Sequence, residues 1–335
     1  MKRLIGRALV AAFCSTAAYG AAQAQDWKPN RPINLIVPWA AGGSTDQVTR
    51  VTSTELENLL GQKIVIVNQP GASGSIGTKS ALDAAKDGYT WTAGAAQDLG
   101  TYQTLGMLDT SIKDWDLYLT VANVEILSVA ANSPFKTAKD VIDAMKAKPG
   151  GVSVATAGVQ SSGHAAMERI AKAAGVTYKE VAYDGGTPAV VATVSGETQV
   201  TTQLAVEQTD MILGKRLRPL AVIGDKALEL QGFGTIEPLS KTLPELTSPI
   251  NYFGIFLPKG VPAEVTATLT KIWAEKMPNV AAVKNYATKR GALFSPMSGD
   301  EAQKAVMPAV QANAWTQFAN GKAKVSPDTV GIAKP

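Results

Sequence analysis

The feature that most constrains the fold is a unit that recurs along the chain: a short β-rich run, a glycine-rich loop and a stretch with helical spacing of apolar residues. In the first unit, Ile33–Val37 precedes a loop at 38–45, and apolar residues then recur at helical spacing up to Leu60. The other β-rich runs lie at 63–67, 89–93, 152–156, 178–183 and 217–223. This alternation predicts an α/β fold with mainly parallel sheets.

The units fall into two groups, because the pattern restarts after residue 125. We expect one lobe of residues 25–126 plus 251–335 and a second lobe of residues 127–250, with extended runs at 126–131 and 252–257 as the crossing strands. A chain of this length accommodates two domains of ordinary size.

Helix starts are suggested by local capping patterns. Ser44 with Gln47 three residues later is typical of a capping box, as is Thr137 with Asp140. Thr187 followed by Pro188 is typical of an N-cap and a first helical residue.

The first 24 residues have the pattern of a secretory signal peptide. A basic head up to Arg7 precedes a short apolar run at 8–19, and Ala22-Gln23-Ala24 is a small-x-small cleavage signal. We therefore expect export to the periplasm and a mature chain that begins at Gln25. A lipid anchor at Cys14 is the alternative, which the bulky Phe13 before it disfavours.

Removal of this leader changes the composition of the chain. The sole cysteine leaves with it, which excludes disulfides, thiolate catalysis and cysteine metal sites. Three cations also leave, so that 29 basic residues face 28 acidic ones, and nothing indicates nucleic-acid binding. No later run of about 20 apolar residues follows.

Four loops lie between the end of a predicted strand and the start of a predicted helix, at 38–45, 68–75, 158–163 and 184–187. In open α/β sheets, ligands bind at the carboxyl ends of the strands. Glycines and helix N-termini there present free N–H groups, and hydroxyls add further donors. Any one such loop is equally typical of a purely structural connection, but four together behind an export signal favour a site for a small carboxylate.

Six motifs resemble one known family. The segment Val37-Pro38-Trp39-Ala40-Ala41-Gly42-Gly43-Ser44-Thr45-Asp46 is similar to the first-strand signature of the tripartite tricarboxylate transporter substrate-binding proteins, the Bug or TctC-like family. In the same order as in that family follow the segments at 68–77, 85–90 and 214–218, with Ser161-x-x-His164 and Tyr183-x-Gly185-Gly186-x-Pro188 before the last. The resemblance covers essentially the whole mature chain.

The resemblance implies a periplasmic-binding-protein (Venus flytrap) fold of two α/β lobes that close on a ligand. It also implies delivery of a small organic carboxylate, aliphatic or aromatic, to a two-component membrane permease, by a monomer with no cofactor and no catalytic activity. In the family the first two loops hold one carboxylate end, partly through ordered water. Carried over by position, the first-lobe contacts are Trp39, Ala40, Ala41, Gly42, Gly43, Ser44, Thr45, Asn68, Gly71, Ala72, Ser73, Gly74 and Ser75. Those of the second lobe are Ser161, Ser162, His164, Tyr183, Gly186, Thr187 and Gln203.

One departure from the family pattern bears on the ligand. Thr201-Thr202-Gln203-Leu204 stands where the family usually has an acidic residue, and this loss of charge argues against an amino-acid ligand with its ammonium group. No arginine or lysine occurs in the four loops. We therefore expect backbone N–H groups, hydroxyls and water to hold the carboxylate, with Arg50 and Arg169 engaged in salt bridges or helix surfaces.

Enzymatic alternatives lack the residues they need. A serine hydrolase needs a base, but the single histidine is His164, and no Gly-x-Ser-x-Gly elbow is present. Gly71, Gly74 and Gly77 are spaced three and three, unlike a dinucleotide fingerprint. Clustered metal ligands are missing. A ligand sensor that presents its closed form to a membrane kinase would need the same pocket, and stays open as an alternative.

Overall fold

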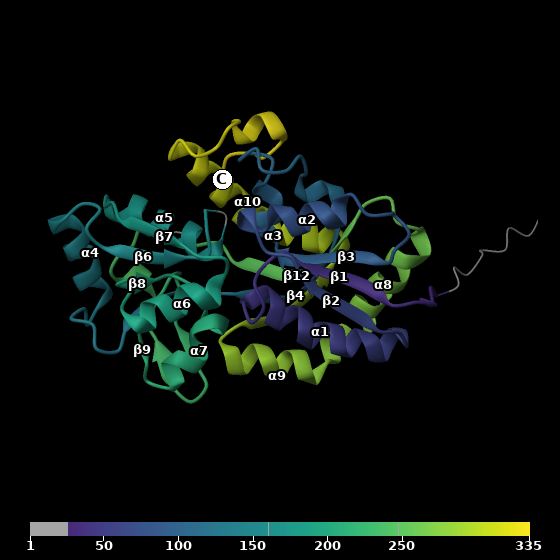
Figure 1. The fold of residues 1–335 in the computed structure, drawn as a ribbon, viewed down its shortest axis with the longest axis horizontal. Coiled ribbons are helices and arrows are strands. Elements are labelled where there is room, and N and C mark those ends of the chain that lie inside the picture. Colours follow the sequence, from purple (N-terminus) through teal and green to yellow (C-terminus); the bar gives the residue numbers. More distant parts are fainter. Residues whose placement is uncertain (1–25, 160, 247) are drawn as a thin grey trace, which may run out of the picture.

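A computed structural model describes residues 26–159, 161–246 and 248–335. The predicted leader and Cys14 lie outside the described residues. The chain forms two α/β lobes side by side along the long axis of the molecule (Figure 1). Within the described residues, no helix combines the length and apolar character needed to span a bilayer.

The first lobe is built on a six-stranded sheet. Its strand order is β13 (Leu293–Ser298), β4 (Trp115–Asn123), β12 (Asn251–Pro258), β3 (Thr90–Ala95), β1 (Ile33–Val37) and β2 (Ile64–Asn68). Strands β2, β1 and β3 pair in parallel, whereas β12 pairs antiparallel with β3 and β4. The helices of this lobe are α1 (Ser44–Leu60), α2 (Ser75–Leu82), α3 (Ala96–Thr101), α8 (Ala263–Glu275), α9 (Ala281–Arg290) and α10 (Gly299–Ala319).

The second lobe repeats this plan on a five-stranded sheet. Its strand order is β7 (Lys179–Ala182), β6 (Ser153–Thr156), β8 (Val200–Thr201), β5 (Ile126–Ala130) and β9 (Leu217–Val222). Its helices are α4 (Ala138–Ala147), α5 (Ser162–Ala174), α6 (Gly186–Ser195) and α7 (Ala205–Leu213), and β10 (Leu228–Leu230) pairs with β11 (Gly234–Ile236). Short 3-10 turns occur at Ala72–Gly74, Ile112–Asp114, Leu239–Lys241, Met277–Asn279 and Pro327–Val330.

Each lobe has its own apolar core. Leu35, Trp91 and Ile255 are fully buried in the first lobe, and Leu127 with Val154 in the second. Burying each of these side chains stabilises the fold by roughly 1.5–3 kcal/mol. Two cores around two sheets are what the recurring strand–loop–helix unit predicts.

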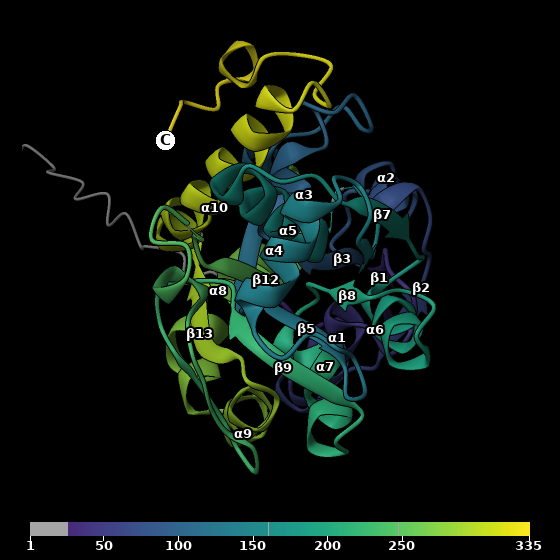
Figure 2. The ribbon, with the colours of Figure 1, turned by 90° about the vertical axis from the view of Figure 1, so that its left-hand side faces the viewer.

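The chain crosses between the lobes after β4 and again before β12. The extended runs predicted as crossings are strands within the sheets, β5 in the second lobe and β12 in the first. The predicted lobe boundaries at 126/127 and 250/251 lie at the starts of these strands and stay predictions. From β12 onward the chain remains in the first lobe, where β13 joins the same sheet, and α10 also contacts α5 of the second lobe (Figure 2).

The α/β prediction is confirmed, and the six predicted strands lie within two residues of the observed ones. The sheets are more mixed than expected, because β5, β12 and β13 pair antiparallel with their neighbours. The capping box of Thr137 and Asp140 is confirmed: Asp140 N–H donates to Thr137 Oγ1 over 3.2 Å, and Thr137 N–H to Asp140 Oδ2 over 2.9 Å.

The two other cap predictions are wrong. Gly43 is the N-cap of α1 and Gly185 that of α6, so that α1 begins one residue earlier than predicted from Ser44 and α6 two residues earlier than predicted from Thr187. In neither case does a side chain of the N-cap supply the hydrogen bond. The physical reason is the interface between the lobes, where groups from the opposite lobe contact both helix starts.

Candidate ligand-binding site

The four glycine-rich loops meet in pairs across the interface between the lobes. Thr187 Oγ1 in the fourth loop donates to the carbonyl of Gly42 in the first over 2.8 Å. In the other pair, a Cβ on Gly158 would lie 2.9 Å from Ser73 Oγ. Parallel strands place their carboxyl ends at one edge of a sheet, and the two lobes turn these edges toward each other.

A small cavity of about 30 Å³ lies between the lobes. It is lined by Trp39, Gly43, Ser44, Thr45, Asp98, Phe253 of the first lobe and Ala157, Ser161, Ser162, Gly186, Gln203, Leu204, Glu207 of the second. This volume accommodates one or two water molecules. A molecule as large as a dicarboxylate enters only when the lobes separate and side chains move.

The carboxyl group of Glu207 lies where three helices begin. Glu207 Oε1 accepts from the backbone N–H of Ser44, the first residue of α1, over 2.9 Å, and Oε2 accepts from Leu204 N–H, at the start of α7, over 3.3 Å. A Cβ on Gly186, at the start of α6, would lie 2.1 Å from the same carboxyl group. Helix N-termini favour negative charge because their N–H groups are free and their dipoles converge.

Gln203 adds a further contact to Glu207. With its amide oriented so that both groups are satisfied, Gln203 donates to Glu207 Oε2 over 3.1 Å and accepts from Ala157 N–H over 3.0 Å. Burial between the lobes raises the pKa of Glu207, and the hydrogen bonds from Ser44 counteract this rise in part.

Asp98 is a second acid in the cavity wall. It lies in the first turn of α3, directly after β3, is 4% exposed, and its Oδ1 has no hydrogen-bond partner. Burial raises the pKa of Asp98 well above its ordinary value, and the nearby charges of Glu125 and Glu207 raise it further. Two acids, Asp98 and Glu207, therefore line one cavity, although the segment 201–204 lacks the acidic residue that the family usually has there.

The cations nearest in sequence are engaged elsewhere, as expected. Arg50 Nε and Nη2 each donate to the Asp46 carboxylate over 2.9 Å. Arg169 is buried, with Nη2 3.5 Å from Glu125 Oε1. Of the described residues that line the cavity, none is an arginine or a lysine.

The structure brings together part of the predicted site. Eight predicted residues line the cavity: Trp39, Gly43, Ser44, Thr45, Ser161, Ser162, Gly186 and Gln203. The other twelve lie outside its lining: Ala40, Ala41, Gly42, Asn68, Gly71, Ala72, Ser73, Gly74, Ser75, His164, Tyr183 and Thr187. Contact of either group with a ligand stays a prediction.

The lining also contains residues that the sequence reasoning missed: Asp98, Ala157, Leu204, Glu207 and Phe253. Asp98 had a usable signal, because it follows the end of a predicted strand as the four loops do. Glu207 had a weaker one, since an acid in the first turn of a helix points to the helix N-terminus.

The second loop of the first lobe acts as a support. Asn68 Nδ2 donates to the carbonyl of Trp39 and to Asp46 Oδ1, each over 3.0 Å. Ala72 and Ser73 adopt positive φ angles of 43° and 52°, a strained backbone. Tyr102 Oη, at the end of α3 in the same lobe, donates to the carbonyl of Ser73 over 3.2 Å and holds this turn in place.

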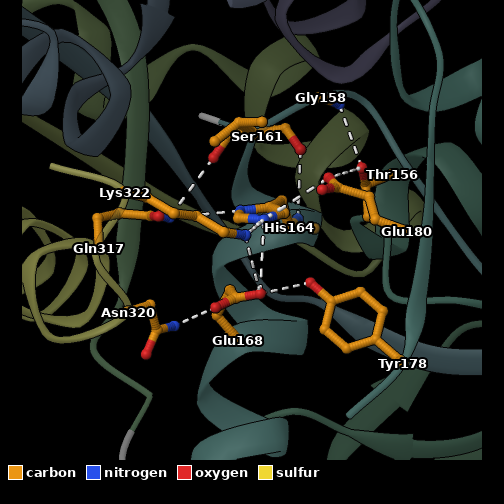
Figure 3. Close-up of polar contacts among 12 residues, drawn as sticks. Thr156, Gly158, Ser161, His164, Glu168, Tyr178, Glu180, Gln317, Asn320 and Lys322 are labelled. Atoms are coloured by element: carbon orange, nitrogen blue, oxygen red, sulfur yellow. Dashed lines mark hydrogen bonds and ion pairs between the residues drawn. The ribbon is translucent and has the colours of Figure 1, made fainter. Parts of the chain in front are cut away.

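His164 belongs to a polar network at a separate contact between the lobes (Figure 3). Lys322 Nζ, in the segment after α10, donates to His164 Nε2 over 2.9 Å, and Glu168 Oε1 and Glu180 Oε1 each lie 3.6 Å from the same nitrogen. Because Nε2 accepts, the ring proton is assigned to Nδ1. Burial lowers the pKa of His164, and the charge of Lys322 lowers it further. The ring is fully buried and joins α5 to the C-terminal segment.

The chain matches the family model described as "Tripartite tricarboxylate transporter family receptor" over residues 48–319. It is similar to a protein encoded in the tcbD-tcbE intergenic region of Pseudomonas sp. strain P51, at 32% identity over 77% of each chain. It is also similar to BugT of Bordetella pertussis, at 30% identity over 86% of this chain and 89% of that one.

Solved structures share the fold. The periplasmic binding protein BugD superposes with a TM-score of 0.79 at 23% identity, over 88% of this chain and 99% of that one. A protein of R. palustris solved with adipate gives a TM-score of 0.78 at 23% identity, with coverage of 88% and 99%. MatC from Rhodopseudomonas palustris, solved with bound malate, superposes with a TM-score of 0.74 at 23% identity, over 88% of this chain and 97% of that one. The chain therefore belongs to the tripartite tricarboxylate transporter receptor family of periplasmic binding proteins, whose members bind substrates and are not enzymes.

Proposed function

We propose that this protein captures a small organic carboxylate between its lobes and delivers it to a two-component membrane permease of the tripartite tricarboxylate type. The observation that carries this proposal is the convergence of the α1 and α6 N-termini, one from each lobe, on a single cavity with neutral donors in its wall. Adipate and malate, which two structural neighbours bind, are both dicarboxylates.

The donors are the hydroxyls of Ser161 and Ser162, which line the cavity, and N–H groups in the first turn of α1 other than that of Ser44, which already donates to Glu207. Each hydrogen bond to a charged group contributes roughly 1.5–3 kcal/mol. Several such bonds reach the free energy of micromolar binding, about −8 kcal/mol. Trp39 and Phe253 in the lining offer a flat apolar surface that also suits an aromatic acid.

Binding requires motion, because the cavity holds far less than a dicarboxylate. We infer that the lobes open, admit the ligand and close on it, with the loop contacts of Thr187 to Gly42 and Gly158 to Ser73 made again in the closed state. The mature protein would be a periplasmic monomer that begins at Gln25, after cleavage behind Ala24. Intact mass of an exported preparation tests the cleavage, and a lipid on Cys14 contradicts it.

The function is tested with the mature protein against a panel of aliphatic and aromatic carboxylates. A bound ligand raises the melting temperature by mass action, and calorimetry gives its affinity. Ser161→Ala and Ser162→Ala should each weaken binding about fivefold or more, while Ser80→Ala, which removes a hydroxyl bonded within α2, should not. Absence of binding across the panel contradicts the proposal.

Delivery is tested separately from binding. Vesicles that contain the permease should take up the labelled ligand only when the loaded protein is added outside. If the ligand-bound form instead stimulates a membrane kinase and supports no uptake, the sensor alternative replaces delivery.

A further inference from the structure

The cavity wall carries two acids and no cation from the described chain. Asp98 and Glu207 come from opposite lobes and interact electrostatically. Glu125, the third acid nearby, has its own partner in Arg169. Burying a carboxyl group without a cationic partner lowers the stability of the fold. Residues that lower stability in this way are found mainly at functional sites, where a bound ligand offsets the loss.

The two acids differ in how far their own chain satisfies them. Glu207 is held in place by the N–H groups of Ser44 and Leu204, which fix both oxygens at the cavity. Asp98 is nine-tenths buried or more, and its Oδ1 contacts no donor. A group that enters the cavity therefore meets a fixed acceptor on one side and an unsatisfied acceptor on the other.

A second carboxylate is the wrong group for this part of the cavity. It would lie beside two acids, and each of these acids in its ionised form would repel it strongly in a desolvated site. A protonated nitrogen has the opposite charge and supplies a donor to Asp98 Oδ1, which has no hydrogen-bond partner. A buried ion pair of this kind is favourable when both its charge and its hydrogen bonds are matched.

We propose that the ligand carries a protonated nitrogen as well as a carboxylate, and that Asp98 and Glu207 determine this specificity by holding the nitrogen between the lobes. The inference rests on the proposed function, because it assumes that the carboxylate end is held in the same cavity. It assigns Asp98 and Glu207 a direct contact with the ligand. Since one acid comes from each lobe, the nitrogen also links the lobes in the closed state.

The competing interpretation is that the Glu207 carboxylate occupies the anion site itself and blocks it when no ligand is bound. Its carboxylate lies at the N-termini of α1 and α6, where a ligand carboxylate would also be stabilised, so ligand and Glu207 would compete. This interpretation predicts that removing the Glu207 charge strengthens dicarboxylate binding and leaves amino ligands unchanged. It leaves the unsatisfied Asp98 without a role.

The test uses pairs of probes that differ in one end group: glutarate against 4-aminobutyrate, and adipate against 6-aminohexanoate, with α-amino acids as a third set. Affinities of the mature protein are measured by calorimetry and melting shifts. We expect at least one amino member to bind tenfold or more tightly than its dicarboxylate partner. Asp98→Asn and Glu207→Gln should each weaken that ligand at least tenfold and reduce its advantage. Glu275→Gln, which removes an exposed acid on α8, is the matched control and should change nothing.

The outcomes separate this inference from the proposed function. If wild-type protein binds dicarboxylates more tightly than every amino partner, the inference is wrong and the proposed function stands. If Glu207→Gln increases the affinity for dicarboxylates without reducing the affinity for amino ligands, Glu207 blocks the anion site and the inference is again wrong. If no carboxylate of any set binds, both are wrong. Near-ultraviolet circular dichroism of each variant shows whether a lost affinity reflects lost folding.

Discussion

Thr187 of the second lobe donates a hydrogen bond of 2.8 Å to the carbonyl oxygen of Gly42 in the first lobe. This contact lies at the mouth of the interface, where the first and fourth loops meet. It joins the start of α6 to the turn before α1, across the interface between the lobes. The sequence predicted that the Thr187 hydroxyl caps its own helix by accepting from a backbone N–H there. In the structure the hydroxyl instead donates to the carbonyl of Gly42 in the other lobe.

Thr187→Val should therefore shift the molecule toward its open form. The loss of one hydrogen bond costs roughly 1 kcal/mol, which is about a fivefold change in the closed-to-open ratio. Small-angle scattering should show a larger radius of gyration without ligand, and affinity should fall by a similar factor. Thr187→Ser keeps the hydroxyl and should restore both values. An unchanged radius in the valine variant contradicts this role.

The network around His164 should make the second contact between the lobes sensitive to acid. Its pKa is lowered by burial, so between that lowered value and the ordinary 6.5 the unfolded chain binds more protons than the folded one. The free energy of unfolding therefore rises with pH through this window and falls as the pH drops. Glu168, Glu180 and Lys322 face the ring and tune the effect (Figure 3).

The measurement compares urea unfolding of wild type and His164→Gln between pH 7.5 and 5.5. Wild type should lose more free energy of unfolding on acidification than the variant, because only wild type has a buried imidazole that gains a proton on unfolding. Comparing the two cancels the contributions that other groups make to both. Parallel pH profiles would show that the ring does not change its protonation on unfolding.

Gly186→Ala should disturb the cavity directly. The new Cβ would lie 2.1 Å from the Glu207 carboxyl group, which must move, while the backbone of Gly186 adopts no positive φ. We expect a loss of about 1–3 kcal/mol in stability and at least tenfold in ligand affinity. Gly224→Ala is the control, because the atom nearest to its Cβ lies 3.9 Å away. Equal effects in both variants would contradict the placement of Gly186 in the site.

The strands and the two-lobed plan could be predicted from the sequence because they depend on local patterns. The runs that end at Val37 and Thr156 are short and rich in β-branched residues, each is followed by a glycine-containing loop, and both are strands in the sheets. The pairing of β5 and β12 could not be predicted in the same way. Their partners are distant in sequence, and antiparallel pairing leaves no local signal that distinguishes it.

The site could be predicted only where its residues follow strands. Ser44, Ser161 and Gly186 line the cavity because each begins a helix after a strand. Glu207 lies inside no such loop, and its carboxyl group reaches the cavity because the second lobe closes against α1. The positions of Asp98 and Glu207 relative to each other depend on how two lobes pack, which no local pattern encodes.

The two cavity acids should couple ligand binding to proton release. Burial raises the pKa of both Asp98 and Glu207 above the ordinary value of a carboxyl group, which favours the protonated form of each when no ligand is bound. A protonated nitrogen beside them stabilises the charged carboxylates and lowers their pKa. Binding of an amino ligand should therefore release protons, and affinity should fall as the pH drops through the raised pKa values. Calorimetry in two buffers of different ionisation enthalpy counts the protons released.

Asp98→Asn should reduce this proton release, and it should also stabilise the protein without ligand. Between the ordinary carboxyl pKa and the raised value, the folded protein binds more protons than the unfolded chain, so the free energy of unfolding decreases as the pH rises. An asparagine carries no such cost, and we expect a gain of roughly 0.5–2 kcal/mol at neutral pH with a flatter pH profile. If Asp98→Asn binds the ligand more weakly but has a higher melting temperature, Asp98 serves ligand binding at a cost in stability. Equal stability and equal proton release in wild type and Asp98→Asn would contradict a buried acid at this position.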